Sequence, residues 1–476
     1  MKTLVIILTL FSFSAWGQQV YQVHEVEKSA QPAGGTAYLN QFIAANIQIP
    51  IKSAAKGMSA KVFVKGIVET DGSMSGLEIV RSVDQFCDSE AIRLLSLYRA
   101  WKPAMQKGEP VRQLTVFPVS FRTDPIPEFD STQHAIIEYF DKNNISASEP
   151  QKYKFRNVIP VDMRGFVRDD IQYEELRLNQ WKLVKKIPFE KKQIRAYVSE
   201  EGKPDSVNAF RLSARNDEYE SAYEEVIIQP DEKILSHNIY PGAGKPPLSA
   251  KFYYLSGMLK QNRADDGAGL IIVTEWYDNG QIYSVSEVGG GKGKVIKNVW
   301  QKNGGQIVID GNGWGKINGN YYNRSTTFEE GKVVNGNKSG RWTTKLADST
   351  LIFEEFYEDG KLIKGIRQDK VEYTEQDNRP AQFKGGPSKM YQFLGNNIQY
   401  PYEASRRKIS GRVVVSFVVQ EDGTLTDYQI DRKAGQGLDE EALRVVKKSS
   451  GLWEPGMMRG QKVKIRYTLP INFDVK

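Results

Sequence analysis

The chain repeats itself once at long range, and this duplication constrains its fold more than any other feature. Residues 34–122 correspond to residues 385–474 at a shift of 351 positions, which becomes 352 after one inserted residue near Ser450. The matched landmarks are Asn46-Ile47-Gln48-Ile49-Pro50 with Asn397-Ile398-Gln399-Tyr400-Pro401, Asp71-Gly72 with Asp422-Gly423, Glu90-Ala91 with Glu441-Ala442, and Trp101-Lys102-Pro103 with Trp453-Glu454-Pro455. Both ends of the chain therefore encode the same small folding unit, here called copy 1 and copy 2.

Each copy has the pattern of a small α+β unit. Apolar residues spaced i, i+3, i+4 and i+8 predict a first helix that ends before Pro50 or Pro401. These residues are Leu39, Phe42, Ile43 and Ile47 in copy 1, and Met390, Phe393, Leu394 and Ile398 in copy 2. A strand of alternating valines, an Asp-Gly hairpin turn, a second helix and a last strand follow. Cys87 falls at a core position of the second helix, which favours a small buried hydrophobe over a reactive thiol.

The last strand of each copy is a candidate sheet edge. Pro118 and Pro470 occupy equivalent places in this strand. A proline cannot donate a ladder hydrogen bond, so it belongs at an edge or at a bulge. In copy 2 the strand alternates apolar side chains with a basic row, Lys462, Lys464 and Arg466.

The middle of the chain, from about residue 124 to residue 377, shows no helical pattern of any length. It contains short aromatic strands that end in turn residues, with glycines spaced by roughly 23 to 29 positions. The clearest units end at Gly257, Gly280, Gly304, Gly331 and Gly360. A hairpin of this size buries its apolar face only when a neighbour stacks on it, so the spacing predicts a repeat array.

No constellation of residues predicts catalysis or cofactor binding. The three histidines, His24, His134 and His237, are isolated in sequence, which favours ordinary surface residues over metal ligands or a catalytic triad. The glycine-rich run at residues 289–294 lacks the spacing and the Ser/Thr of a phosphate loop. The acidic pairs are typical of solvated loops; they are Asp169-Asp170, Glu174-Glu175 and Asp265-Asp266. We therefore predict no catalytic, cofactor-binding or metal site, and a protein that is not an enzyme.

The first seventeen residues predict export. Lys2 precedes a nearly continuous apolar stretch from Leu4 to Phe11, and the segment from Ser12 to Trp16 leads to the small residue Gly17, which is the layout of a cleaved signal peptide. The stretch is shorter than the roughly 20 residues that a spanning helix needs. We expect a periplasmic protein; the alternative is an inner-membrane anchor formed by an uncleaved signal. A net charge of +7 over 476 residues is mild and does not favour nucleic-acid binding.

These landmarks resemble a known family. In copy 2 the order of Tyr400-Pro401, Asp422-Gly423, Trp453-Glu454-Pro455 and a final strand ending at Phe473 resembles the C-terminal domain of the TonB energy transducers. Copy 1 keeps the same landmarks less faithfully. Residues 250–368 resemble the MORN-like repeats of the YwqK antitoxin type, which implies an interaction scaffold.

The resemblance and the repeat pattern together define the expected organisation. The fold class is α+β, with two small TonB C-terminal-like domains flanking a mostly-β, hairpin-repeat middle. The expected segments are a signal peptide at 1–17, copy 1 at 25–123, a β-rich region of unknown type at 124–249, MORN-like hairpin repeats at 250–370 and copy 2 at 378–476. Diverged repeats are one alternative for the region 124–249, which includes Tyr139 to Asn143; residues 131–245 suggest no function.

The resemblance also implies a function. TonB-like domains bind extended peptides by β-augmentation, in which a visiting segment adds itself to an open sheet edge. The expected partner-binding residues in copy 2 are Lys462, Val463, Lys464, Ile465, Arg466, Tyr467 and Thr468. Those expected in copy 1, on weaker grounds, are Val111, Arg112, Gln113, Leu114, Thr115 and Val116. Lysine and proline on an edge also protect against unwanted pairing, and this alternative stays open.

The implied partners are proteins or peptides, such as outer-membrane TonB-dependent receptors or other envelope proteins involved in transport. We expect no nucleic acid, no small-molecule substrate, and membrane contact only through partners. Because the Pro-rich spacer of the energy transducers is missing, we expect a soluble periplasmic relative that does not itself transmit force. The alternative function is an envelope scaffold that works through its repeat array.

Overall fold

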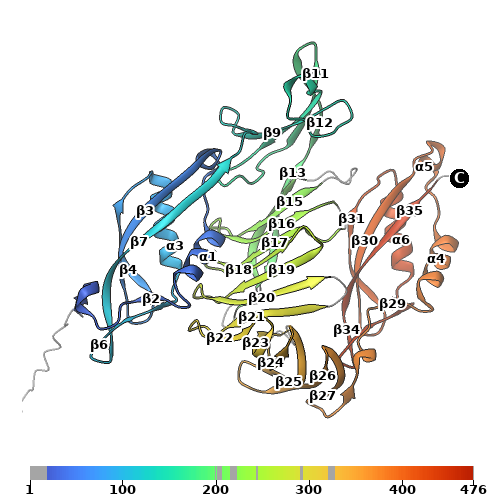
Figure 1. The fold of residues 1–476 in the computed structure, drawn as a ribbon. Helices are drawn as coiled ribbons and strands as arrows, with labels where there is room; N and C mark the ends of the chain where they lie inside the picture. Colours follow the sequence, from blue (N-terminus) through green and yellow to red (C-terminus); the bar gives the residue numbers. More distant parts are fainter. Residues whose placement is uncertain are drawn as a thin grey trace, which may run out of the picture.

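The computed structural model describes residues 19–198, 200, 206–214, 222–242, 245–289, 293–319 and 327–474. A large antiparallel sheet forms the middle, with one α+β unit on each side of it and a smaller sheet projecting beyond it (Figure 1). This arrangement confirms the expected fold class. The predicted signal peptide lies outside the described residues. Within them, no helix has both the length and the apolar character needed to cross a bilayer.

Copy 1 packs its helices against one face of a twisted sheet. Its strand order in the described part of the chain is β1-β7-β3-β4, with β6 also paired to β7. The elements are β1 (Val20–Tyr21), η1 (Val23–Glu25), β2 (Gln31–Pro32), α1 (Thr36–Asn46), α2 (Ile51–Ala54), β3 (Lys56–Val68), β4 (Met74–Arg81), α3 (Gln85–Leu97), β5 (Trp101–Lys102), β6 (Ala104–Gln106) and β7 (Glu109–Pro125).

The predicted apolar stripes form the core of copy 1. Leu39, Phe42 and Ile43 on α1 are buried, and Ile47 packs against them just after the helix ends. Cys87 is 1% exposed within the same core, as predicted. Burial raises the pKa of its thiol to about 12, so the thiolate that would react is disfavoured at neutral pH.

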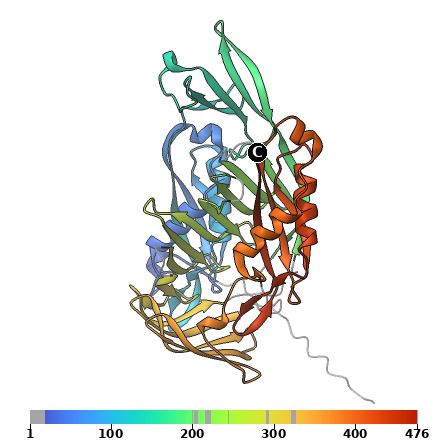
Figure 2. The same ribbon diagram turned by 90° about the vertical axis from the view of Figure 1, so that its right-hand side faces the viewer.

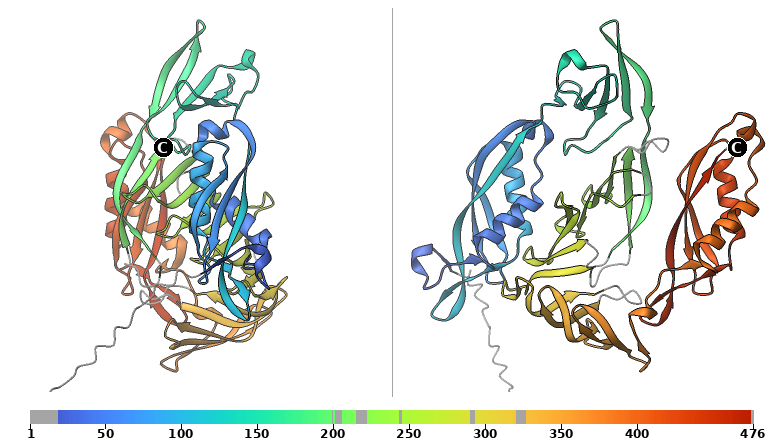
Figure 3. Two further views of the ribbon diagram at one scale, coloured as in Figure 1. Left: turned by 90° about the vertical axis from the view of Figure 1, so that its left-hand side faces the viewer. Right: turned by 45° about the vertical axis from the view of Figure 1, so that its right-hand side comes forward.

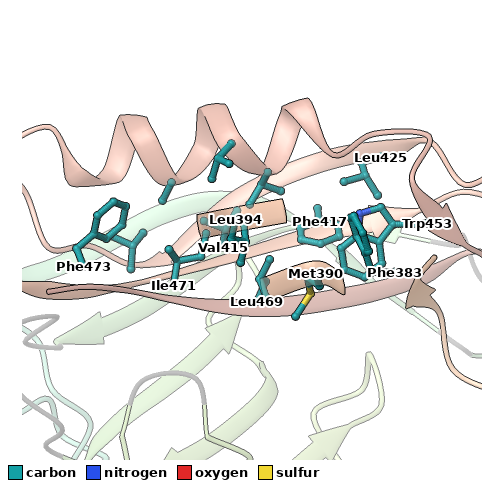
Figure 4. Close-up of a cluster of buried hydrophobic side chains, with 14 of the residues drawn as sticks. Phe383, Met390, Leu394, Val415, Phe417, Leu425, Trp453, Leu469, Ile471 and Phe473 are labelled. Carbon is teal, nitrogen blue, oxygen red and sulfur yellow. The ribbon is translucent and has the colours of Figure 1, made fainter. Parts of the chain in front are cut away.

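Copy 2 repeats this design on the sheet β31-β30-β35, as counted within the described residues. Its helices lie on the face turned away from the middle sheet (Figure 2). The core between helices and sheet includes Met390, Leu394, Phe417 and Trp453 (Figure 4). The elements are β29 (Gln382–Phe383), α4 (Gly386–Asn397), α5 (Tyr402–Arg406), β30 (Gly411–Val419), β31 (Leu425–Arg432), α6 (Leu438–Lys448), β32 (Trp453–Glu454), β33 (Gly456–Met458), β34 (Gln461–Val463) and β35 (Ile465–Phe473).

One polar network is the same in both copies. In copy 1, Glu90 accepts the Gln48 N–H at 2.6 Å, while the guanidinium of its ion-pair partner Arg93 donates to the Asn46 carbonyl at 2.7 Å. In copy 2, Glu441 accepts the Gln399 N–H at 2.5 Å and Arg444 donates to the Asn397 carbonyl at 2.6 Å. The network satisfies the backbone where the chain leaves the first helix, so it ties the two helices together.

A small separate sheet follows copy 1 and projects from the body (Figure 3). Its strand order within the described residues is β12-β11-β10-β9-β8. Tyr139 and Phe140, considered in sequence as part of a diverged repeat, lie here and not in the large sheet. The elements are β8 (Phe129–Asp130), β9 (Ala135–Phe140), η2 (Pro150–Lys152), β10 (Phe155–Pro160), β11 (Ile171–Arg177) and β12 (Gln180–Ile187). We call this sheet the lobe.

The large sheet is a meander of sixteen strands in the described part of the chain, each paired with its sequence neighbours. We call it the array. Its strands are β13 (Phe189–Tyr197), β14 (Ser206–Ala214), β15 (Tyr223–Ile228), β16 (Ile234–Tyr240), β17 (Ser249–Tyr253), β18 (Leu259–Asp265), β19 (Leu270–Trp276), β20 (Ile282–Gly289), β21 (Lys294–Trp300), β22 (Gln306–Ile309), β23 (Asn312–Asn318), β24 (Thr327–Val334), β25 (Asn337–Leu346), β26 (Leu351–Glu358), β27 (Lys361–Arg367) and β28 (Glu372–Tyr373), and the 3-10 helix η3 (Glu375–Asp377) leads from it to copy 2.

Successive hairpins of the array are tied by tyrosine hydroxyls. Tyr254 donates to the Trp276 carbonyl at 2.7 Å, and Tyr277, one unit later, donates to the Trp300 carbonyl at 2.9 Å. The predicted turns at Gly257, Gly280, Gly304 and Gly360 are present.

The prediction of a turn at Gly331 is wrong. Gly331 lies inside β24, where a Cβ would come within 2.5 Å of the Trp342 ring, so the glycine makes room for an indole. The turn that follows is at Asn335-Gly336, where both residues have positive φ.

Copy 1 docks its helices onto the hairpin turns of the array. The Asn46 side chain accepts the Leu259 N–H at 2.7 Å, and the Asn279 carbonyl accepts the Arg99 N–H at 2.8 Å. Gly280 lies so close to Phe42 that a Cβ there would come within 3.0 Å of the Phe42 ring. The turn glycines thus allow the array backbone to approach the helical side of copy 1.

Copy 2 is fastened to the array through one arginine. Arg459, in the β33–β34 turn, donates to Glu355 at 2.8 Å and to Glu329 at 3.0 Å, and its guanidinium lies 4.2 Å from the centre of the Phe353 ring. All three charged side chains are largely buried. Burial would raise the pKa of Glu329, but Lys338 and Arg459 hold it below its usual value. We call this contact the latch.

Replacing Arg459 should weaken the latch strongly. Arg459→Ala leaves two buried carboxylates without their guanidinium, which costs about 3–5 kcal/mol when a buried pair loses one partner. Because the pKa of Glu329 is lowered in the folded protein, the difference from wild type should be largest at neutral pH and shrink as the pH falls through that lowered pKa. Urea unfolding at several pH values measures it.

The matched control is Lys107→Ala. Lys107 occupies the same hairpin turn in copy 1, and its side chain is exposed. An equal loss of stability in both variants would contradict the latch.

Candidate strand-edge site

The strand β35 forms one edge of the copy 2 sheet. It pairs antiparallel with β30 from Ile465, opposite Val419, to Phe473, opposite Gly411. On its other side no strand is paired with it in the part of the chain that the structure describes. The last strand of copy 2 is therefore an edge.

The direction of the free backbone groups follows from the turn at the other side of β30. Gln420 donates its N–H to Thr424 across that turn, so Gln420 points toward β31. Backbone direction alternates along an antiparallel strand, hence Val419 and Phe417 point toward β35 and pair with Ile465 and Tyr467. The N–H and C=O groups of the intervening residues of β35 then point outward.

Those intervening residues are Arg466, Thr468 and Pro470. The proline at 470 agrees with this assignment, because an outward position is the one where a missing N–H breaks no ladder bond. The side chains of Arg466 and Thr468 are exposed, while those of Leu469 and Ile471 are buried in the core (Figure 4). The strand thus presents unpaired backbone N–H and C=O groups to an incoming peptide, while its buried apolar side chains hold it to the core.

The expected single strand from Lys462 to Phe473 is interrupted at Lys464, which corrects the prediction. Lys462 and Val463 belong to β34, which forms a hairpin with β33 and not with β30. The pairing partner changes at Lys464, and the strand ends where it changes. Of the predicted copy 2 residues, Ile465, Arg466, Tyr467 and Thr468 lie on the sheet edge.

The three basic residues of the predicted strand also fall into two groups. Lys462 and Lys464 are exposed and make no ion pair among the described residues. Arg466 is partly held by the sheet, since its guanidinium lies 3.3 Å from the Ser416 hydroxyl. The edge therefore carries two free positive charges at its start and a third that bends over the polar face.

The edge of copy 1 is partly occupied by the chain itself. All six predicted residues lie on β7, where Val111 pairs with Ala104 of β6. Arg112 and Gln113 pair in parallel with Val20 and Tyr21 of β1. Leu114, Thr115 and Val116 pair with β3 on one side and have no strand on the other in the described residues.

A two-residue strand makes the difference between the copies. In copy 1 the segment before the first helix begins with β1, followed by η1 with a Gln22–Glu25 capping box. In copy 2 the corresponding segment is β28, followed by η3 with a Thr374–Asp377 capping box. Yet β28 pairs with β27 of the array and not with β35. The same segment covers the start of the edge in copy 1, at Arg112 and Gln113, and extends the array in copy 2.

The sequence held a signal for this difference that periodicity did not reveal. A strand of two residues is too short to show alternation. Aligning the two capping boxes at a shift of 352 would have placed Tyr21 opposite Tyr373 and shown that the duplication begins before residue 25.

Neither the histidines nor the acidic pairs assemble into a site. His24 is exposed, His134 Nδ1 lies 3.0 Å from the Val161 carbonyl, and His237 Nε2 lies 2.6 Å from Glu224. The last two are therefore partly buried structural residues, which corrects the expectation of surface histidines. No group of metal-ligating side chains occurs within the described residues.

The acidic pairs and the glycine-rich run have ordinary surroundings. Glu174 and Glu175 form ion pairs with neighbouring basic residues, and Asp170 and Asp266 accept backbone N–H bonds. Residues 290–292 of the glycine-rich run lie outside the described part.

Both end units match one known family. Residues 45–123 and 396–475 each match the model of the Gram-negative bacterial TonB protein C-terminal. The chain thus carries two TonB C-terminal-like segments that flank its middle. No curated protein matched the chain. The two matched segments contain β7 and β35, so both strand edges lie inside the family-like units.

Amide hydrogen exchange should reveal the alternation along β35. The N–H groups of Arg466 and Thr468 point outward and should exchange quickly, whereas those of Tyr467 and Leu469 are bonded to β30 and should be protected. NMR-detected exchange of the full chain resolves these residues. Equal protection at Thr468 and Tyr467 would contradict an open edge.

Proposed function

We propose that the protein is a TonB-like component of the Gram-negative envelope that binds extended peptide segments by β-augmentation at the outer edge of β35. The observation that carries the proposal is the free backbone of Arg466 and Thr468 on a strand that ends the sheet. Main-chain bonds to this edge would supply affinity, and the side chains flanking it would supply specificity.

The positive charge beside the edge indicates which kind of partner would bind there. Lys462 and Lys464 are exposed and not ion-paired within the described residues, and they stand where an added strand would begin. They favour a segment with acidic residues, through long-range attraction and through suppression of basic competitors. Partners of this kind include outer-membrane receptors and other envelope proteins. If these lysines instead protect the edge against strand addition, no segment binds there.

The two copies have different roles in this proposal. Copy 2 is the binding unit because its edge is open from its first residue, Ile465, and begins beside the exposed Lys462 and Lys464, whereas β1 covers the start of the copy 1 edge. Copy 1 is chiefly a docking unit, since its helices bind the array and β1 fills part of its edge. The proposed organisation keeps the signal peptide and the two end units expected from sequence and divides the middle into the lobe and the array, with an exported chain and no enzymatic activity.

A second candidate function rests on the array. Sixteen strands in one sheet, within the described residues, form an extended surface. The sequence resemblance of residues 250–368 to MORN-like repeats of the YwqK antitoxin type supports an interaction scaffold. In this alternative the array is the working surface, and the end units cap or fasten it. Deleting residues 385–476 separates the two functions: partner capture is lost if copy 2 binds and is retained if the array binds.

Proline scanning of the edge tests β-augmentation. Thr468→Pro removes an outward N–H two residues before Pro470 and leaves the bonds to β30 intact, so the fold should survive while the added strand is blocked. With a photo-crosslinking residue at Lys464 in intact cells, we expect capture of the partner to fall by roughly tenfold or more, as a lost hydrogen bond and a steric clash would give.

The chain supplies its own control. Val116→Pro makes the same change two residues before Pro118 in copy 1 and should leave capture unchanged. Undiminished capture with Thr468→Pro would reject binding at this edge.

A further inference from the structure

The charge of the chain is concentrated in one segment. Between Arg177 and Tyr197 there are seven basic residues and one acidic residue, a net charge of +6, whereas the whole chain has 65 basic and 58 acidic residues and a net charge of +7. All other residues together therefore carry a net charge of only +1. The basic residues are Arg177, Lys182, Lys185, Lys186, Lys191, Lys192 and Arg195.

This segment is also the edge of two sheets in succession. β12 is the last strand of the lobe and β13 is the first strand of the array, with Pro188 between them. We call the segment the basic edge. Most of its side chains are exposed, and Lys182 and Lys192 make no ion pair among the described residues. Two members of the basic edge pair with acids outside it, Arg177 with Glu175 and Lys186 with Asp170, while its own Glu190 pairs with Arg211.

The tip of the basic edge is apolar and strained. Leu178 and Asn179 form the two-residue turn between β11 and β12, and both have positive φ, 50° and 56°. Asparagine and glycine tolerate this conformation, whereas leucine does not favour it. Leu178 is nevertheless 95% exposed, at the end of a hairpin that projects from the body (Figures 1 and 3). Water and backbone geometry both disfavour a leucine there, and a strained residue of this kind is a starting point for a hypothesis about function.

The basic edge is poorly suited to pairing with another strand. The pairing register shifts between the Tyr173–Lys185 and Glu174–Leu183 pairs, so Val184 has no partner on β11 and forms a bulge. Pro188 interrupts the edge four residues further along. Bulges and prolines are features that prevent strand addition. An exposed apolar tip with half-exposed Leu183 and Val184 beside Lys182, which makes no ion pair among the described residues, is instead typical of a surface that meets a charged interface.

We propose that the basic edge docks the protein on an anionic lipid bilayer, with Leu178 entering the headgroup layer and the lysines contacting acidic headgroups. Each basic residue near an anionic bilayer adds attraction that fades within a Debye length, and one apolar side chain adds a shallow anchor. The contact departs from the expectation that the membrane is reached only through partners. It requires neither the edge of β35 nor the latch.

Vesicle flotation of the full chain without residues 1–17 tests the proposal. The protein should float with vesicles of equal parts phosphatidylcholine and phosphatidylglycerol, should not float with phosphatidylcholine vesicles, and should be released by high salt. Lys182→Gln with Lys192→Gln should raise the lipid concentration for half-binding roughly tenfold or more. Leu178→Ser should weaken binding without changing its salt dependence.

The matched control replaces Lys52 and Lys61 by glutamine, because both are exposed and without an ion pair in the described part of the chain. Thermal unfolding checks that each variant folds. No flotation with the anionic vesicles, or equal loss in the control, would overturn the proposal. Binding to polyglutamate with no flotation would also overturn it, in favour of an acidic polypeptide partner.

Discussion

Unpaired backbone groups at strand edges are the constraint on which the rest of this structure depends. A strand that ends a sheet presents N–H and C=O groups that must find water, a neighbour or a partner. The meander from β13 to β28 pairs every internal strand with its sequence neighbours, so only the two end strands have an unpaired side. At one end, the lysines of β13 and Pro188 make pairing unfavourable. At the other, β28 is supplied by the segment that leads into copy 2.

That use of β28 explains why a duplicated unit has two different edges. The segment before each first helix has the same local design, a short strand and a capping box. It can form a strand on only one sheet. In copy 1 no other sheet precedes it in the described chain, and it pairs with β7. In copy 2 the array lies immediately before it and takes the strand, which leaves the start of β35 without the neighbour that β7 has at Arg112 and Gln113. The open start of this edge is thus a consequence of chain order.

The two copies also attach to the array through different contacts. Tyr38 and Tyr98 line the side of copy 1 that meets the array turns, and Tyr38 packs against Trp300 with ring centres 5.5 Å apart. At the equivalent positions copy 2 has Lys389 and Ser449, which cannot replace those aromatic contacts. The latch provides a different attachment, in which one guanidinium from copy 2 bonds to two buried carboxylates that Lys338, Tyr357 and Tyr373 of the array also contact. Copy 1 is therefore held by packing and copy 2 by charge.

Features that depend on residues close together in sequence could be predicted, whereas features that depend on residues far apart in sequence could not. The helix stripes, the Asp-Gly turns and the core position of Cys87 follow from local periodicity and were predicted, as was an edge at Pro470. Gly331 was assigned to a turn because composition shows a glycine but not the Trp342 ring that needs its space. The latch joins Arg459 to Glu329 across 130 positions, and no local pattern marks such a pair.

The same distinction applies to the candidate edge. Alternation of basic and apolar residues predicted one strand from Lys462 to Phe473, because periodicity continues through Lys464 even though the pairing partner changes there. Side-chain pattern reports which face of a strand is buried, whereas binding by strand addition depends on which backbone groups are unpaired. Those groups are set by the neighbours on either side. At the start of β35 the missing neighbour is β28, which pairs elsewhere, and further along neither β35 nor β7 has a second neighbour in the described residues. An edge of this kind can be recognised in a sequence only when the competing sheets are known.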